Sequence, residues 1–234
     1  MDHRILILLL GLQLFIPHMQ AQVFIPTAYW RGYSNCSTDY CPTLNPMNAA
    51  LQGTGGSTQI VSTCIDDNFI GVTLPWDFHM GDVPFRDFFI GSNTYITAGT
   101  GSSLYSGLAA NVPAFPKFHL GAGDANYQRV YRINGSNYFR VRYEGNSAYG
   151  TCGSVNTIYE MTFFRPTVNY QYVQIVFGAH GGTGRPFGVA SASAWYQTTT
   201  PITANSSYVI YSTNGGNTWT LLPNYSITGA GTSL

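Results

Sequence analysis

The clearest pattern of apolar and polar positions lies between Trp76 and Gly99, where two strand-like runs flank a short turn. The first run, Val83 to Ile90, is apolar and aromatic, and the second, Tyr95 to Ala98, carries residues that suit a pleated sheet. The residues between them, Gly91 to Asn93, are turn formers, and Asn93 can take the left-handed conformation that so short a connection requires. This stretch predicts a β-hairpin.

A second hairpin is predicted between Tyr127 and Glu144, around the turn sequence Asn-Gly-Ser-Asn. In its second arm apolar and charged residues alternate: Phe139, Val141 and Tyr143 are separated by Arg140, Arg142 and Glu144. Because successive side chains of a strand point to opposite faces, this arm is predicted to have one face in the core and one in water. From Ile158 to Phe164 both sets of alternating positions hold apolar residues, which predicts a strand covered on both faces.

Shorter strand-like runs fill the rest of the chain, with turn formers between them. They are Thr58 to Cys64, Asn68 to Leu74, Lys117 to Gly121, Asn156 to Arg165, Tyr170 to Phe177, Arg185 to Tyr196, Ser207 to Ser212 and Thr218 to Leu222. About ten strands without a helical period predict an all-β fold: a single two-sheet antiparallel β-sandwich, jelly-roll-like in kind. We assign this domain to residues 58–234.

The start of the chain is typical of a secretory signal peptide, residues 1–21. Arg4 precedes an apolar run, Ile5 to Ile16, and cleavage is expected after Ala21. An uncleaved anchor is disfavoured, because the run is too short to cross a bilayer core of about 30 Å. We therefore expect a secreted protein, displayed outside the cell, on a cell surface or on a virion, with no membrane span after cleavage.

Residues 22–57 form an irregular N-terminal arm that begins with the strand-like residues Val23, Phe24 and Ile25. An extended peptide can add a strand to an exposed sheet edge. We predict that this start of the arm pairs with another copy, which would link copies head to tail into a filament. The alternative is that the arm packs on its own sandwich.

Charge is scarce: 9% of residues are charged, with ten Lys and Arg against ten Asp and Glu. Such a chain has no field to gather phosphates, so nucleic acid is not expected as a partner. The chain also holds 17 Tyr, 14 Phe and 4 Trp, together with 26 Gly. This composition suits strands joined by tight turns, and exposed Tyr also suits an adhesive surface.

The four cysteines are even in number in a chain expected to be exported, which favours two disulfides. Three pairings are open, and we favour Cys36 with Cys41 and Cys64 with Cys152. A zinc site is the weaker alternative, because the chain lacks a Cys-x-x-Cys pair.

Residues with catalytic or metal-binding chemistry are few. The only two glutamates, Glu144 and Glu160, are assigned structural roles rather than those of a glycosidase acid and base. No nucleophile signature is present, and the widely spaced His79, His119 and His180 do not suggest a metal triad. Two loops carry oxygen ligands that calcium uses, at Asp66-Asp67-Asn68 and Asp124-Ala125-Asn126, but we favour turn formation as their role. No cofactor is expected.

Several residues are candidates for ligand contact or for glycosylation. The candidate aromatic platforms for a glycan or a protein partner are Tyr29, Trp30, Tyr149, Trp195 and Tyr196. Core packing is the default for each of them. Four Asn-x-Ser/Thr sequons, at Asn35, Asn134, Asn205 and Asn224, would accept glycosylation where the source has the machinery.

Three stretches resemble a β-sandwich domain of phage virion and tail-fibre proteins: Leu74 to Phe78, Phe88 to Gly99 and Gly121 to Arg132. The similarity runs from about Asp66 to Trp219. The chain is also similar, more loosely, to the nidogen-type sandwich of extracellular proteins. The resemblance implies a surface-displayed module without enzymatic activity.

These observations favour a non-catalytic, secreted structural or adhesive subunit that assembles with copies of itself in a fibre, filament or virion-like surface. The first alternative is a glycan-binding, lectin-like module that recognises a cell-surface glycan. A secreted glycan-active enzyme comes third.

Overall fold

The computed structural model describes residues 51, 53–104, 116–121, 123–148, 150–166, 171–181, 186–191 and 195–222. The chain divides into two units, residues 1–36 and 37–234, and all described residues belong to the second. They form strands and turns without a helix. Accordingly, no helix that could span a membrane occurs among them.

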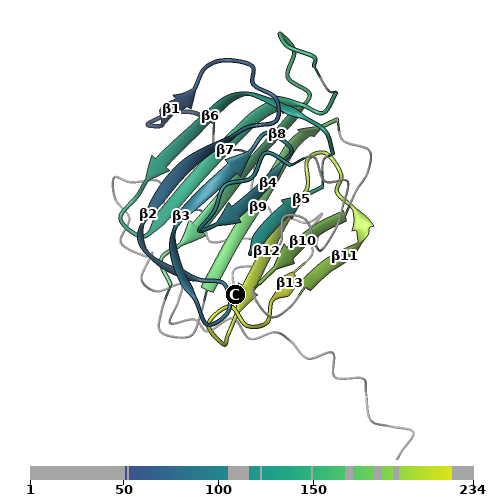
Figure 1. Cartoon of the computed structure of the whole chain (residues 1–234). Coiled ribbons are helices and arrows are strands. Elements are labelled where there is room, and N and C mark those ends of the chain that lie inside the picture. Colours follow the sequence, from purple (N-terminus) through teal and green to yellow (C-terminus); the bar gives the residue numbers. More distant parts are fainter. Residues whose placement is uncertain are drawn as a thin grey trace, which may run out of the picture. The chain divides into compact units, whose positions relative to one another are not determined.

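Within the described residues, thirteen strands form two antiparallel sheets (Figure 1). The seven-stranded sheet has the order β1 (Thr58–Val61), β6 (Asn126–Asn134), β7 (Tyr138–Asn146), β8 (Thr157–Phe164), β9 (Gln171–His180), β12 (Ser207–Ser212) and β13 (Thr220–Leu222). The six-stranded sheet has the order β11 (Trp195–Pro201), β10 (Pro186–Ala190), β5 (Lys117–Leu120), β4 (Tyr95–Ala98), β3 (Pro84–Gly91) and β2 (Phe69–His79). The predicted all-β, two-sheet sandwich is confirmed.

Aromatic rings join the two sheets across the core. Phe163 of β8 lies with its ring centroid 5.2 Å from that of Phe78, 5.0 Å from that of Phe88 and 5.7 Å from that of Phe118. These three partners belong to the other sheet. Trp219 stacks on Phe78 at 6.0 Å. Edge-to-face ring pairs of this kind add about 1 kcal/mol each to the burial of their apolar area.

The hairpin of β3 and β4 forms where the sequence predicts it, but its left-handed residue is Thr94, with φ 57°, and not Asn93. The Thr94 amide donates to the Gly91 carbonyl at 3.3 Å, so the turn closes one residue later than expected. Asn93 is buried and holds other loops instead. Its Oδ1 accepts from the Ala125 amide at 2.9 Å, and its Nδ2 donates to Asp67 Oδ1 at 3.1 Å.

Two predictions about strands are wrong. The run from Arg185 to Tyr196 is not one strand but parts of two, because the chain reverses after Ala190 and pairs Val189 with Tyr196. The reversal carries only Ser and Ala, so no strong turn former marks it in the sequence. The charged face of β7 does not lie in water either: Arg140 is 3% exposed and Glu144 6%.

The predicted disulfide between Cys64 and Cys152 is present, with 5.8 Å between its Cα atoms and a sequence separation of 88. It ties the loop before β2 to the loop between β7 and β8. Cys36 and Cys41 lie outside the described residues, as does the arm with Val23, Phe24 and Ile25.

Candidate functional site

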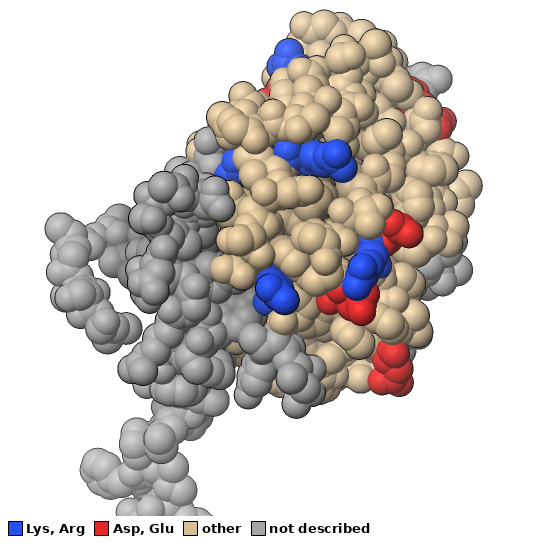
Figure 2. Space-filling view, turned by 90° about the vertical axis from the view of Figure 1, so that its left-hand side faces the viewer, with Lys and Arg blue, Asp and Glu red and all other residues tan. Residues whose placement is uncertain are grey.

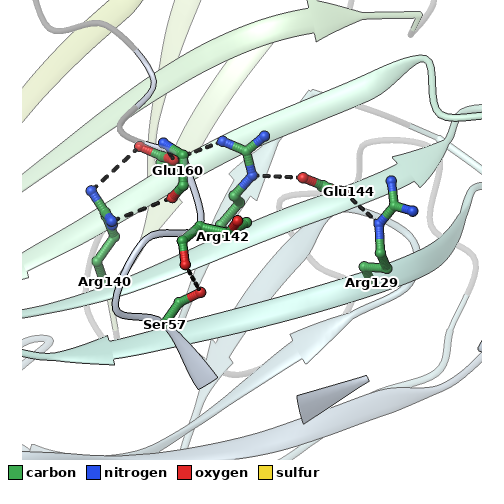
Figure 3. A network of polar contacts seen from close by, with 8 residues as sticks. Ser57, Arg129, Arg140, Arg142, Glu144 and Glu160 are labelled. Atoms are coloured by element: carbon green, nitrogen blue, oxygen red, sulfur yellow. Dashed lines mark hydrogen bonds and ion pairs between the residues drawn. The ribbon is translucent and has the colours of Figure 1, made fainter. Parts of the chain in front are cut away.

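A row of alternating arginine and glutamate side chains crosses three strands of the seven-stranded sheet, on the face turned away from the core (Figure 3). Arg129 of β6 and Arg142 of β7 donate from Nε to the two carboxylate oxygens of Glu144, at 2.6 and 2.7 Å. Arg142 also donates from Nη1 to Glu160 Oε1 at 2.9 Å. Arg140 Nη1 lies 3.8 Å from Glu160 Oε2. We call these five residues the arginine–glutamate ladder.

Strand register places these charges beside one another. Arg129 faces Glu144 across the β6–β7 pair, and Arg142 faces Glu160 across the β7–β8 pair. Arg142 and Glu144 are two residues apart in β7 and therefore share a face. The core positions Phe139, Val141 and Tyr143 point to the other face of the same strand. The alternation that predicts the strand thus also assembles the ladder.

Most of the ladder is withdrawn from water. The side chains of Arg140 and Glu160 are 3% and 2% exposed, whereas that of Arg129 at one end is 45% exposed. Burial alone would raise the pKa of the Glu144 carboxyl, but hydrogen bonds from Arg142 and Arg129 outweigh it and hold that pKa below its ordinary value. Burial would lower the pKa of Arg142, but its hydrogen bonds to Glu144 and Glu160 outweigh that effect and raise it.

Backbone from the segment before β1 contacts the ladder directly. The Gly53 amide donates to Glu160 Oε1 at 3.1 Å, and the Gly53 carbonyl accepts from Arg140 Nη2 at 3.5 Å. The neighbouring Leu51 packs on Gly178 of β9, where a Cβ would come within 2.4 Å of the leucine Cδ1. Gly178 therefore leaves room for Leu51, and the segment lies over the outer face of β7 to β9.

The ladder contains Glu144 and Glu160, the two residues that a glycosidase mechanism would need as acid and base. Glu144 and Glu160 both accept charge-assisted hydrogen bonds from arginine. For Glu144 these bonds hold the pKa of the carboxyl below its ordinary value. A glycosidase general acid needs the opposite, a carboxyl group whose raised pKa keeps it protonated. Sequence analysis assigned these glutamates structural roles but missed their arginine partners. The available signal was the Arg-x-Glu spacing within β7.

Three carboxylates gather at the loop end of the sandwich, near the disulfide. Oxygens of Asp66, Asp67 and Asp124 all lie within 4.8 Å of one another, and this is the one cluster of metal-ligand type among the described residues. Burial raises the pKa of Asp124, and the charges of Asp66 and Asp67 raise it further. Hard cations such as calcium use oxygens of this kind.

Each of the first two aspartates also has a local partner. Asp66 Oδ1 accepts from the Asp67 amide at 2.9 Å, in keeping with the predicted turn. Asp67 has a positive φ of 45° and accepts from Asn93. The buried hydroxyl of Tyr143 lies close by in the fold, 2.7 Å from the Ser92 carbonyl and 3.0 Å from that of Asn126. The loop end is thus held by several buried polar contacts.

The three candidate histidines do not form a metal group with other ligands in the part of the chain that is described. The backbone amide of His79 donates to the side-chain carbonyl of Gln171. His119 is buried on β5. Burial lowers the pKa of His180, whose ring lies 5.6 Å from that of Phe177.

The candidate aromatic platforms fall mostly beyond the described structure. Tyr29, Trp30 and Tyr149 lie outside the described residues, and Trp195 and Tyr196 are placed only as backbone, at the start of β11. Among the described aromatics the bulk are buried, and Phe69 at 39% exposure is the one exposed large apolar ring. The aromatic richness of the chain is therefore largely used in the core.

Two of the four sequons can be located. Asn134 ends β6 and Asn205 precedes β12, and both residues are exposed. Asn35 and Asn224 lie outside the described residues.

Comparison of the chain with protein-family models, with curated proteins and with solved structures finds no match in any of the three. The resemblance to phage virion and tail-fibre sandwiches, and to nidogen-type sandwiches, therefore stays a prediction.

Proposed function

We propose that the chain is a non-catalytic structural or adhesive subunit that acts outside the cell and assembles with copies of itself. The observation that carries this proposal is the arginine–glutamate ladder. It engages both glutamates of the chain in buried ion pairs, on a sheet face where an enzyme or a binding module would use free polar groups. Buried ion pairs between neighbouring strands can fix their register, which supports a structural role for these glutamates.

The surface supports the same proposal. On the side of the molecule seen in Figure 2, charged side chains are few, and most of the surface is uncharged. Low charge does little to keep copies of a protein separate in solution. The Cys64–Cys152 disulfide is compatible with an extracellular location, where such bonds persist.

The test is the mass of the purified chain, residues 22–234, measured by light scattering over a range of concentrations and complemented by electron microscopy. We expect assemblies that grow with concentration. A protein that stays monomeric, and gives a glycan-array signal lost in Trp195→Ala, would be a glycan-binding module instead. Turnover of a polysaccharide that is lost in Glu144→Gln or Glu160→Gln, with unchanged circular dichroism, would make it an enzyme.

A further inference from the structure

The outer strand of the six-stranded sheet, β2, has an open edge within the part of the chain that the structure describes. It lies at the end of the strand order, and its strand partner among the described residues is β3 (Figure 1). Over Phe69 to Thr73 the pairing with β3 is regular, and after Thr73 the register shifts. Pro75 follows within this irregular part, and Asp77 there pairs with Arg86. The regular part, residues 69–73, we call the β2 edge.

Hydrogen-bond alternation shows which backbone groups of the β2 edge point outward. The Ser92 amide donates to the Asn68 carbonyl at 2.8 Å, so even-numbered residues of β2 bond to β3. In an antiparallel pair the intervening residues direct their N–H and C=O away from the partner strand. Gly71 and Thr73 therefore present backbone donors and acceptors that no described strand pairs, and both residues are exposed.

Side chains leave this edge accessible and largely apolar, except that the Thr73 hydroxyl donates to Asp87 Oδ1 at 2.7 Å. Phe69 is 39% exposed and stands edge-on to Phe89, with ring centroids 5.6 Å apart. Gly71 lies between Phe69 and Thr73 on the same face and has no side chain. A Cβ added to Gly71 would meet the Phe89 ring at 3.3 Å. On the other face Ile70 and Val72 border the core. Neither a charge nor a proline interrupts residues 69–73.

The other three edge strands are less suited to accept an added strand. Strand β1 has four residues with a register shift inside them, and β13 has three residues. Strand β11 has a register shift against β10 and ends at Pro201. Natural proteins blunt sheet edges by such short strands, irregular pairing and prolines. In β2 the register shift and Pro75 come only after Thr73, so the five residues of the β2 edge are themselves regular and free of proline.

We infer that the β2 edge accepts residues Val23 to Ile25 from a second copy of this chain as an added strand. This inference rests on the proposed self-assembly and specifies its acceptor. The donor is a short, uncharged run that Pro26 ends, and the acceptor is a short, uncharged run that the irregular stretch around Pro75 ends, so the donor fits within the length of the acceptor and shares its lack of charge. Val23 and Ile25 then extend the core rim beside Ile70 and Val72, and Phe24 lies beside Phe69.

The arm has the reach for this contact. Between Ile25 and Leu51, the first described residue, an extended chain spans up to roughly 80 Å, which exceeds the size of one domain. A donor segment and an acceptor edge at different places on the same chain make a heterologous contact. Each copy then offers one donor and one acceptor, and assemblies grow head to tail.

Two substitutions block the contact from opposite sides. Phe24→Pro removes a donor amide from the arm, and Thr73→Pro removes an outward amide from the β2 edge without touching the β2–β3 hydrogen bonds. The matched controls, Phe24→Leu and Thr73→Val, keep both amides. Circular dichroism and thermal midpoint establish that each variant is folded.

We expect wild type and both controls to assemble and each proline variant alone to be monomeric by light scattering. An equimolar mixture of the two proline variants should give a dimer and nothing larger, because it contains one intact donor and one intact acceptor. A mixture that stays monomeric would overturn the inference. Assembly that persists in Thr73→Pro would place the contact elsewhere and leave the proposed function standing, whereas a monomeric wild type would overturn both.

A peptide covers the case in which Thr73→Pro does not fold. A synthetic peptide of residues 22–29 should bind the Phe24→Pro variant in a 1:1 ratio and shorten wild-type assemblies. The same peptide N-methylated at Phe24 keeps every side chain and should do neither. Equal binding of both peptides would contradict strand addition. A wild-type dimer that Thr73→Pro dissociates and Phe24→Pro does not would instead indicate pairing of two β2 edges.

Discussion

At the scale of single residues, Glu144 is the centre of the ladder, because it accepts from Arg129 at 2.6 Å and from Arg142 at 2.7 Å. A carboxylate held by two guanidinium groups has a lower pKa in the folded protein than in the unfolded chain. The folded state then binds fewer protons near that pKa. Stability from Glu144 is present above the unfolded-state value and is lost as the pH falls toward the folded-state value.

This predicts a pH-dependent loss of stability that Glu144→Gln removes. We expect the urea midpoint of the wild type to fall as the pH drops below 4.5, the ordinary pKa of the group. Glu144→Gln should already be less stable at pH 7, by about 2 kcal/mol, because charge-assisted hydrogen bonds are lost. Its midpoint should fall less steeply below pH 4.5. Parallel wild-type and variant curves would contradict the role of Glu144.

The contribution of Asp124 to stability depends on pH in the opposite direction to that of Glu144. Its raised pKa means that the folded state favours the protonated carboxyl, so stability falls as the pH rises past the unfolded-state value. Asp124→Asn should therefore raise the thermal midpoint at pH 7 in metal-free buffer. Asp77→Asn is the control, since that exposed carboxylate is paired with Arg86 and its loss should change little. A wild type stabilised by millimolar calcium, with the effect absent in Asp124→Asn, would instead make the three aspartates a cation site.

Two stacked tyrosines allow a buried hydroxyl with hydrogen-bond partners to be compared with a buried hydroxyl without them. The rings of Tyr143 and Tyr159 lie 4.8 Å apart, and both are fully buried. The Tyr143 hydroxyl reaches two carbonyls, whereas the Tyr159 hydroxyl has no hydrogen-bond partner in the described structure. Tyr143→Phe should cost about 1–3 kcal/mol in urea unfolding, and Tyr159→Phe close to nothing. Equal costs would show that the hydroxyl of Tyr143 does not hold the loop end.

At the scale of elements, the strands were largely predictable and their surroundings were not. Alternation placed β3, β4 and β7 because a period of two reflects backbone geometry, which is local. It could not show that the charged face of β7 is buried, since that depends on Glu160 in the next strand and on Gly53 far along the chain. The position of the left-handed residue at Thr94 depends likewise on what Asn93 contacts.

The disulfide is the covalent link between distant elements. In the chain-entropy view, closing the loop between Cys64 and Cys152, at a sequence separation of 88, destabilises the unfolded chain by about 4 kcal/mol. The double variant Cys64→Ser and Cys152→Ser should lower the free energy of unfolding by that order. Unfolding in urea, with unreduced wild type as the reference, measures the change. An unchanged midpoint would mean that the link contributes nothing beyond the packing of its loops.

At the scale of the whole molecule, the sandwich combines a rigid interior with an exterior that resists association poorly. Both sheets share an aromatic core, and the ladder fixes the outer face of the larger sheet. The smaller sheet ends in an edge without charges or prolines over residues 69–73. In the proposed assembly, this edge of the described sandwich and the strand-like run in the arm form the head-to-tail contact.

The most direct test of this account is the molar mass of residues 22–234 by multi-angle light scattering as the concentration rises. The account predicts a mass that increases with concentration beyond that of a dimer, because a head-to-tail contact does not close. A constant monomer mass at the highest concentration reached, in folded protein, would contradict it.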